Sequence, residues 1–342
     1  MFESLLIAAH GSRDDAGVEE FWEFADAWRR LRPDRLQAAG FLEFAQPTIG
    51  DAVDELVAQG ATRIVVVPAM LMAAGHVKND VPSEVQEARR RHPAVVFQMA
   101  RALDIHPALL ELCQVRYRES IADRPAIAAE RTLLLLVGRG TSDPDANANI
   151  ARISRFLWES YGVGWASVAY SGVTTPNVDQ ALTACRRLGF QRIVVQPYFL
   201  FDGILLKRIR DTAAHHAALD PSVEFVTVPH LRLHPLLLQA FEDRAHEAAH
   251  GTPHMNCDLC KYRVKLIGRE LDLGAPQAGH HHHVRAESDF GLDFDDLDHG
   301  HDHRRRSRRR STTPISALAT DPSFHPWDER LLQRLQLIHD AR

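Results

Sequence analysis

An internal repeat constrains this chain more than any other feature of its sequence. Residues 1–128 and 129–255 align at an offset of 129, which drops to 128 after Phe201. The matching pairs include Gly11 and Gly140, Pro47 and Pro176, Gly60 and Gly189, Gly75 and Gly203, and His106 and His234. Repetition at a fixed period indicates that one structural unit occurs twice. We therefore predict two tandem domains and a tail, residues 256–342.

Short apolar runs alternate with segments of helical periodicity inside each unit. The run 5–10 is followed by a segment with an apolar face formed by Phe21, Phe24, Ala25 and Trp28. The run 63–71 is almost continuously apolar, which is typical of a strand covered on both faces. This order of strands and helices predicts an α/β fold, in which each unit is a small parallel sheet with helices on both faces.

Composition limits the class of protein. The chain has 342 residues, of which 45% are hydrophobic and 25% charged, so a packed core is expected and a wholly disordered chain is excluded. The net charge of −5 gives no global basic excess, so nucleic acid is not expected as a partner. No apolar run is long enough to cross a membrane, and the first residues lack a signal-peptide pattern, so the cytoplasm is the expected compartment.

The four cysteines are too few for a disulfide scaffold of this length. Cys113 and Cys185 stand alone in helical segments and are predicted to be core residues. Cys257 and Cys260 have the spacing of half a metal site, and a reduced thiol pair is the simpler alternative. His246, His250 and His254 follow a four-residue spacing, although Gly251 and Pro253 predict that the helix ends before His254.

The tail differs in composition from the two units. Twelve of the 20 histidines lie from His246 onward, four of them in the run His280–His283. Seven acidic residues within 287–302 precede two arginine runs, and such segments are expected to be largely disordered. A short amphipathic helix is predicted near residues 328–341. The histidines could hold metal loosely for transfer, or the tail could have no essential role.

Two histidines follow predicted strands of the first unit. His10 comes directly after the first strand and His76 soon after the third. Ligands of open parallel sheets bind at the carboxyl ends of the strands, so both side chains are expected at one edge. Imidazole binds cobalt, nickel, iron and zinc, and it accepts protons near neutral pH. A metal site is therefore predicted in the first unit.

The segments AAHGSRDDAGVEEF, FLEFAQPTI and VVVPAMLMAAGHVKNDVP resemble the class II tetrapyrrole chelatases, specifically the sirohydrochlorin cobaltochelatases. The resemblance covers both units, and long members of the family also carry a Met-x-Cys-x-x-Cys motif and a histidine-rich tract. It implies insertion of Co²⁺ into sirohydrochlorin or a related tetrapyrrole in anaerobic cobalamin biosynthesis, without an organic cofactor. It also implies a [4Fe-4S] cluster at Cys257 and Cys260.

The resemblance also assigns roles to residues. His10 corresponds to the proton acceptor and a metal ligand, His76 to the second ligand, and Glu43 to an acidic residue that contacts the pyrrole nitrogens. The residues expected to contact the substrate within the first unit are Ser12, Arg13, Leu71, Met72, Ala73, Ala74, Gly75 and Lys78. Small residues in the 71–75 loop would allow a flat ring to approach closely.

The second unit departs from this pattern, because Arg139, Gly172 and Ile204 replace His10, Glu43 and His76. It therefore cannot build the same site. We expect the two units to face each other across a cleft, in which the second unit supplies cations for the substrate's carboxylates. The expected cations of the second unit are Arg139, Lys207 and Arg208. Arginine suits this task because its fork binds both carboxylate oxygens.

Other functions stay open at this point. Two histidines do not identify the metal, so insertion of Fe²⁺ or Ni²⁺ is an alternative within the same class of enzyme. A metal-binding or storage protein is a second class, in which the histidine-rich tail carries the function. A tetrapyrrole carrier without catalysis is a third. The sequence also leaves open whether the chain forms a homodimer.

Overall fold

The computed structural model describes residues 4–251, 265 and 267–273. The first unit contains β1 (Ser4–Ala9), α1 (Asp15–Leu31), β2 (Gln37–Phe41), α2 (Ile49–Ala58), β3 (Arg63–Pro68), the π-helical turn η1 (His76–Asp80), α3 (Val81–Arg91), β4 (Val96–Met99) and α4 (Pro107–Ile121). The second contains η2 (Ala129–Arg131), β5 (Thr132–Gly138), α5 (Pro144–Tyr161), β6 (Trp165–Tyr170), α6 (Val178–Arg186), β7 (Arg192–Pro197), α7 (Ile204–Leu219), β8 (Glu224–Thr227) and α8 (Pro235–His250); a short turn, η3 (Glu270–Asp272), follows.

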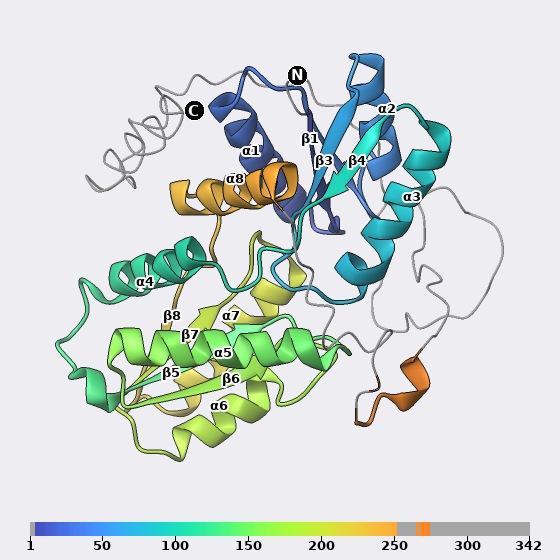
Figure 1. Cartoon of the computed structure of the whole chain (residues 1–342). Helices are drawn as coiled ribbons and strands as arrows, with labels where there is room; N and C mark the ends of the chain where they lie inside the picture. Colours follow the sequence, from blue (N-terminus) through green and yellow to red (C-terminus); the bar gives the residue numbers. More distant parts are fainter. Residues whose placement is uncertain (1–3, 252–264, 266, 274–342) are drawn as a thin grey trace. The chain divides into compact units, whose positions relative to one another are not determined.

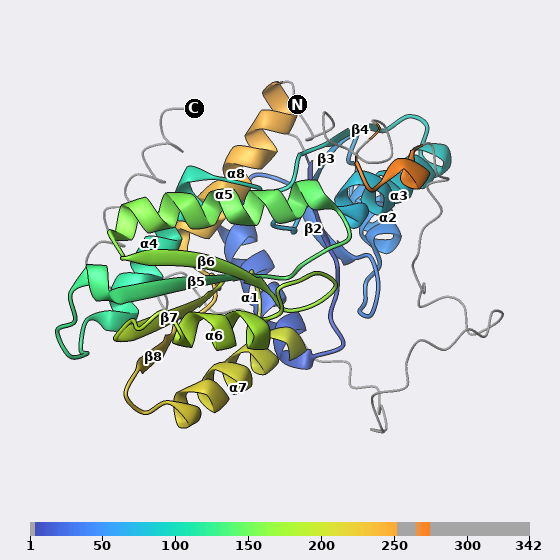
Figure 2. The same ribbon diagram turned by 90° about the horizontal axis from the view of Figure 1, so that it is seen from below.

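Two four-stranded parallel sheets form the core of the described residues (Figure 1). The first has the order β2-β1-β3-β4 and the second the same order, β6-β5-β7-β8. In the first, α1 lies on one face and α2 and α3 on the other; in the second, α5 lies opposite α6 and α7 (Figure 2). The predicted α/β fold with two repeated parallel sheets is therefore confirmed.

Apolar periodicity explains how the helices attach to the sheets. Phe21, Phe24, Ala25 and Trp28 of α1 are buried, as their spacing predicts. On the opposite face of the first sheet, Leu56 of α2 packs in one cluster with strand residues. Matching residues start the helices of both units: the side chains of Asp14 and Asp143 cap α1 and α5, and those of Thr48 and Asn177 form capping boxes at α2 and α6.

The two units exchange their last helices. The α4 helix, which ends the first unit, packs against α5 and β8 of the second, whereas α8 packs against β3 and β4 of the first (Figure 1). Tyr117 of α4 stacks on Tyr161 at 4.1 Å between ring centroids, and Phe241 of α8 lies 4.4 Å from Phe24. The boundary at residue 128 therefore marks a sequence repeat and does not separate two independently packed bodies.

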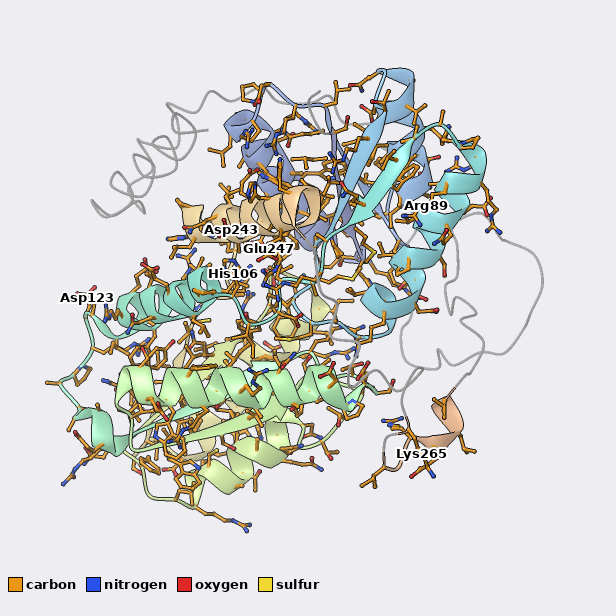
Figure 3. The ribbon with its side chains drawn as sticks, in the orientation of Figure 1. Arg89, His106, Asp123, Asp243, Glu247 and Lys265 are labelled. Atoms are coloured by element: carbon orange, nitrogen blue, oxygen red, sulfur yellow. The ribbon has the colours of Figure 1, made fainter. Side chains whose placement is uncertain are left out.

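Equivalent histidines cap the two exchanged helices. His106 Nδ1 accepts a hydrogen bond from the Ala108 N–H at α4, and His234 Nδ1 accepts one from the Leu236 N–H at α8. His106 also lies beside α8, where its Nε2 is 3.5 Å from Asp243 Oδ2 (Figure 3). Burial lowers the pKa of His106 to about 4 and that of His234 to about 3. The folded chain therefore holds both rings neutral.

Acid should destabilise the fold through these caps. In the unfolded chain a histidine binds a proton below about pH 6.5, whereas His234 in the folded chain stays neutral down to a much lower pH. The neutral His234 cap therefore contributes its full stability above about pH 6.5, and this contribution is lost as the pH falls. At pH 5 the expected loss is about 2 kcal/mol for this residue. His234→Asn keeps a side chain that can cap the helix. Its free energy of unfolding, measured in urea, should decrease less between pH 7 and pH 5 than that of the parent. An equal decrease in both proteins would contradict this role.

The cysteines Cys113 and Cys185 are buried, as predicted, and burial raises the pKa of their thiols to about 12 and about 11. Both are therefore core residues. No helix among the described residues is long and apolar enough to cross a membrane. The predicted helix end is also confirmed, because α8 ends at His250 with Gly251 as its C-cap. The predictions for His254, Cys257, Cys260, the histidine-rich tail and the helix near 328–341 lie outside the described residues.

Candidate functional site

His10, Glu43 and His76 converge at the carboxyl edge of the first sheet. Their potential ligand atoms all lie within 4.8 Å of one another, which no other group of three His, Cys, Asp or Glu residues achieves in the described part of the chain. The Nε2 atoms of the two histidines are 3.0 Å apart, and Glu43 Oε1 is 3.0 Å from His10 Nε2. We refer to these three residues as the triad.

Strand order brings the triad together. β1 lies between β2 and β3, so the chain leaves β1 toward one side of the sheet and returns on the other side of it. Ligands of doubly wound sheets bind at this switch point. His10 directly follows β1, and His76 begins η1 after β3. The sequence prediction of one shared edge is therefore in agreement with the geometry, although His76 begins a helical turn and does not lie in an open loop.

Gly11 allows Glu43 to reach the site. The Glu43 N–H donates to the His10 carbonyl at 3.0 Å, which ties the loop after β2 to the loop after β1. A Cβ atom on Gly11 would lie 1.8 Å from the Glu43 carbonyl oxygen, and Gly11 has a φ of +100°. Only glycine fits this close approach without strain. Glu43 itself is buried, which distinguishes it from an ordinary surface glutamate.

Asp80 orients His76 within the triad. Its Oδ2 lies 2.8 Å from His76 Nδ1, so this ring nitrogen is the donor and Nε2 faces His10 and Glu43. Burial lowers the pKa of His76, the hydrogen bond with Asp80 opposes the shift, and the charges of His10 and Arg139 add to it. The neutral ring with Nε2 turned into the triad is the form that binds a metal ion. Asp80 was not predicted from the sequence, although its four-residue spacing from His76 in HVKND places both residues on one face of a helical turn.

The triad offers a donor set for a divalent transition metal. Two imidazole nitrogens and one carboxylate suit cobalt, nickel, iron or zinc, whereas magnesium and calcium prefer oxygen alone. The described groups supply three protein ligands, so a fourth position is left for a substrate atom. The same carboxylate and imidazoles can also accept protons. The arrangement is therefore chemically suited both to metal binding and to general-base chemistry.

The second unit contributes a cation where the first has His10. Arg139 follows β5, and its charge acts on both His76 and Glu43. Loss of water around the guanidinium lowers the pKa of Arg139 although the residue is exposed overall, and the Glu43 carboxylate opposes that shift. Gly172 and Ile204, which occupy the positions of Glu43 and His76, provide no metal ligand. Arg139 is therefore the part of the second unit that acts on the triad.

Two lysines join the carboxyl edges of the two units. Lys78 donates to Asp143 at 2.8 Å and to Asp145 at 3.0 Å, and its side chain is only 1% exposed. Burial alone would lower the pKa of Lys78, but the hydrogen bonds with Asp143 and Asp145 raise it, so the lysine stays charged. Lys78 therefore links the units, and we leave it out of the cations proposed for the substrate.

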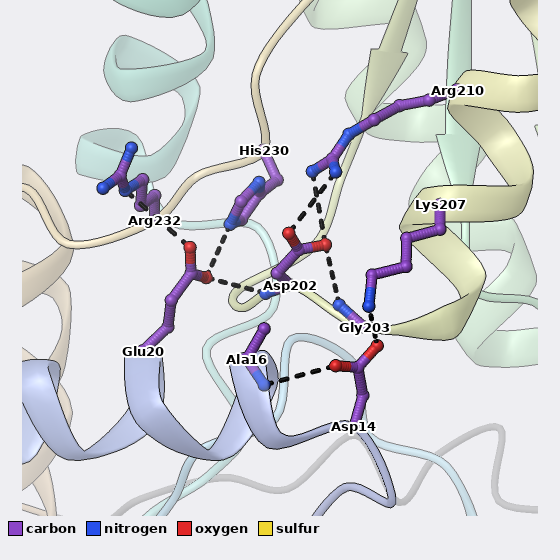
Figure 4. A network of polar contacts seen from close by, with 9 residues as sticks. All are labelled: Asp14, Ala16, Glu20, Asp202, Gly203, Lys207, Arg210, His230 and Arg232. Carbon is purple, nitrogen blue, oxygen red and sulfur yellow. Dashed lines mark hydrogen bonds and ion pairs between the residues drawn. The ribbon is translucent and has the colours of Figure 1, made fainter.

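Lys207 makes the matching contact in the opposite direction. It donates to Asp14 at 2.5 Å, although its side chain is 52% exposed (Figure 4). Asp14 and Asp143 occupy equivalent N-caps, so each unit binds a lysine of the other through the same carboxylate. Beside this contact, Glu20 of α1 accepts hydrogen bonds from the Asp202 N–H and from His230 Nε2 (Figure 4). The two sheet edges therefore face each other through polar contacts.

The remaining predicted contact residues differ in how far they are exposed. Ser12 Oγ accepts a hydrogen bond from the Asp14 N–H, and Arg13 is exposed with its guanidinium 4.8 Å from the ring centre of Phe44. In the 71–75 loop, Ala73 is buried against Val77 and Ala102 and is therefore a core residue. Leu71, Met72, Ala74 and Gly75 are half-buried, and Arg208 is exposed on α7.

Comparisons with known proteins agree with this geometry. The CbiX family model matches residues 4–120 and again residues 133–248. A sirohydrochlorin cobaltochelatase of Priestia megaterium is 35% identical over 266 residues, which are 78% of this chain and 86% of that protein. A sirohydrochlorin ferrochelatase of the same organism is 31% identical over 209 residues, 61% of this chain and 77% of that protein.

A solved structure gives the same picture. The sirohydrochlorin chelatase SirB of Bacillus subtilis subspecies spizizenii, crystallised in complex with cobalt, superposes with a TM-score of 0.62 at 28% identity. The match covers 73% of this chain and 96% of SirB. Because the family model matches twice, over most of both units, the repeat found in the sequence is a repeat of the family's own unit. The chain therefore belongs to the CbiX family of class II tetrapyrrole chelatases.

Proposed function

We propose that this enzyme inserts Co²⁺ into sirohydrochlorin, or into a closely related carboxylated tetrapyrrole, during anaerobic cobalamin biosynthesis. The observation that carries the proposal is the triad: two imidazoles and a buried carboxylate within 4.8 Å of one another at the switch point of the first sheet. Metal is a substrate in this reaction and not a resident cofactor. The site has to bind the ion and then release it.

The proposed reaction exchanges one metal ion for two protons. Co²⁺ binds to His10, Glu43 and His76, and two pyrrole N–H groups of the macrocycle lose their protons as the metal–nitrogen bonds form. His10 and Glu43 are the proposed acceptors, because each would regain a free lone pair as the metal passes to the macrocycle nitrogens and could then take one of the two protons. Asp80 is a positioning residue, which keeps His76 Nε2 directed at the ion.

Cobalt is proposed over iron because the cobaltochelatase of Priestia megaterium is 35% identical to this chain and the ferrochelatase of the same organism is 31% identical. Iron insertion is the second candidate, since the donor set suits both metals. The experiment is an anaerobic incubation of the full chain with sirohydrochlorin and Co²⁺, Fe²⁺ or Ni²⁺ separately, in which the visible spectrum is followed. A rate with Co²⁺ above the uncatalysed rate and above the rates with Fe²⁺ and Ni²⁺ supports the proposal. Faster insertion of Fe²⁺ would contradict the choice of cobalt, and tight binding without acceleration would indicate a carrier.

Arg139 is the proposed contact for the substrate's carboxylates. Arg139→Ala should raise KM several-fold and change kcat little at pH 8, because it removes binding that is the same in ground state and transition state. Added salt should reduce the effect, since ions screen exposed charge pairs. The charge of Arg139 also lowers the pKa of His76, so this pKa should rise in Arg139→Ala. The acid limb of the variant's pH–rate profile should therefore lie at higher pH than that of the parent. Steady-state kinetics test this, with Arg90→Ala on the exposed surface of α3 as the control. A lower kcat with unchanged KM would contradict the assignment.

A further inference from the structure

Two three-residue turns of unusual backbone conformation occupy equivalent positions in the two units, and the first of them directly follows Glu43 of the triad. The Ala45 N–H donates to the Glu43 carbonyl at 2.9 Å, and Phe44 between them has a φ of +63°. In the second unit the Thr174 N–H donates to the Gly172 carbonyl at 2.7 Å, and Val173 has a φ of +66°. A γ-turn with positive φ at its central residue is rare and strained.

The internal repeat explains why the same turn occurs in both units. It does not explain why phenylalanine and valine occupy the central positions. Glycine adopts positive φ without the clash of a Cβ atom, so it would remove the strain at either position. The chain instead has phenylalanine and valine there. A β-branched residue with positive φ is an outlier even among non-glycine residues. Strained residues of this kind cluster at active sites and ligand-binding sites.

Packing does not compensate at Val173. Val173 is exposed, with 73% of its surface accessible to solvent. It therefore buries little apolar area that could offset the strain of its backbone. Phe44 is half-buried. Its ring lies 5.9 Å from the ring of His10, and the Arg13 guanidinium lies 4.8 Å from its centre. Both side chains therefore present apolar surface outward at the ends of β2 and β6.

Both turns are attached to residues of the proposed site. Phe44 directly follows Glu43, and its ring is next to His10. The Gly172 N–H donates to the Arg139 carbonyl at 3.0 Å, so the turn of Val173 is joined to the residue whose charge acts on Glu43 and His76. The strained Phe44 thus lies beside a group that would hold the metal, and the strained Val173 belongs to a turn that is hydrogen-bonded to Arg139.

We infer that Phe44 and Val173 are substrate-contacting residues, which hold a flat, polycarboxylated macrocycle over the triad. The inference rests on the proposed function and extends it. The ring of Phe44 offers a face for stacking on the conjugated macrocycle, and Arg13 beside it pairs with a carboxylate at the macrocycle's edge. Val173 supplies an apolar contact from the second unit. Stacking places the pyrrole nitrogens in register with His10 and Glu43.

Glycine substitutions separate this role from a structural one. Phe44→Gly and Val173→Gly relieve the backbone, so the melting temperature of Val173→Gly should equal or exceed that of the parent. Both variants should nevertheless bind metal-free sirohydrochlorin more weakly, Phe44→Gly by about tenfold, the effect of losing an aromatic stacking contact. Val173→Gly should weaken binding about threefold, as expected for a small apolar contact. Phe44→Tyr should retain parental affinity because it keeps the ring.

The measurement is a fluorescence titration of metal-free sirohydrochlorin with the full chain and each variant, alongside thermal unfolding. Phe44→Ala, which keeps the Cβ atom, replaces Phe44→Gly if the latter is poorly folded. Leu188→Ala is the control, since Leu188 is an exposed apolar residue that follows α6, and it should change nothing. Parental affinity in the Phe44 and Val173 variants, with an active parent, would overturn the inference and leave the proposed function intact. A parent that neither binds nor metallates sirohydrochlorin would instead refute the proposed function.

Discussion

Replacement of His10 or His76 by alanine is expected to lower the initial rate of metal insertion at least about a hundredfold, the usual contribution of a positioned acid–base group. Each substitution removes one of the three candidate ligand atoms that the described residues bring together, and His10→Ala also removes the group 3.0 Å from Glu43. The fold should survive, because neither side chain belongs to the buried core. Insertion rates at saturating metal and macrocycle test this expectation, with circular dichroism as a check of folding.

His92→Ala is the matched control. His92 is also half-buried and also pairs with a carboxylate, that of Asp54 at 2.7 Å, but it lies at the end of α3 and is not part of the triad. Its loss should leave the insertion rate within about twofold of the parent, as for other substitutions outside the chemistry. Near-parental rates in both the His10 and the His76 variants would show that the metal is bound elsewhere.

Lys78→Met is expected to destabilise the fold by about 3–5 kcal/mol, the cost of removing one partner from a buried ion pair. The substitution removes the Lys78 ammonium from the carboxylates of Asp143 and Asp145, whose side chains are buried, 1% and 4% exposed. Equilibrium unfolding in urea measures the effect. Adding Asp143→Asn and Asp145→Asn to Lys78→Met should recover most of the loss, because the uncompensated charges are then gone and Asn still caps a helix.

Lys207→Met provides the comparison within the same molecule. Lys207 binds the equivalent N-cap, Asp14, but its side chain is 52% exposed, and exposed ion pairs contribute little to stability. The two lysine variants should therefore differ several-fold in their effect on the free energy of unfolding. Equal effects would mean that burial does not distinguish the two contacts.

The sequence predicted the fold well because its signals are local. Continuous apolar runs predict buried parallel strands, and the face formed by Phe21, Phe24 and Trp28 predicts a covering helix. The exchange of α4 and α8 could not be predicted in this way. The apolar periodicity of a helix predicts that the helix covers a sheet, but it does not predict which of two similar sheets is covered. That choice depends on long-range contacts such as the one between Phe24 and Phe241.

The candidate site was predicted in part for a related reason. His10 and His76 could be assigned to one sheet edge because strand ends are visible in the sequence. The burial of Lys78 could not be predicted from the sequence. A single lysine in a polar segment gives the same sequence pattern whether its side chain faces solvent or two carboxylates of another unit. Phe44 and Val173 were missed because positive φ is expected at glycine and asparagine, and neither residue signals it.

The predictions for Cys257 and Cys260 lie outside the residues that the structure describes. A [4Fe-4S] cluster at this pair stays a prediction, with a reduced thiol pair as the alternative. Two cysteines supply half of the four ligands that a cluster requires, so the other ligands would have to come from elsewhere. Electron paramagnetic resonance of the anaerobically purified full chain distinguishes the two states after reduction.

His10, Glu43 and His76 are proposed to insert the metal together. The most direct test of this proposal is the initial rate of Co²⁺ insertion into sirohydrochlorin, measured anaerobically for the parent and for Glu43→Gln, a substitution that preserves shape and removes the charge and the basic oxygen. Equilibrium binding of Co²⁺ to both proteins is recorded in the same samples. We predict insertion well above the uncatalysed rate for the parent, and a rate at least about a hundredfold lower for Glu43→Gln. Parental insertion by Glu43→Gln, or insertion by the parent no faster than without protein, would contradict the account.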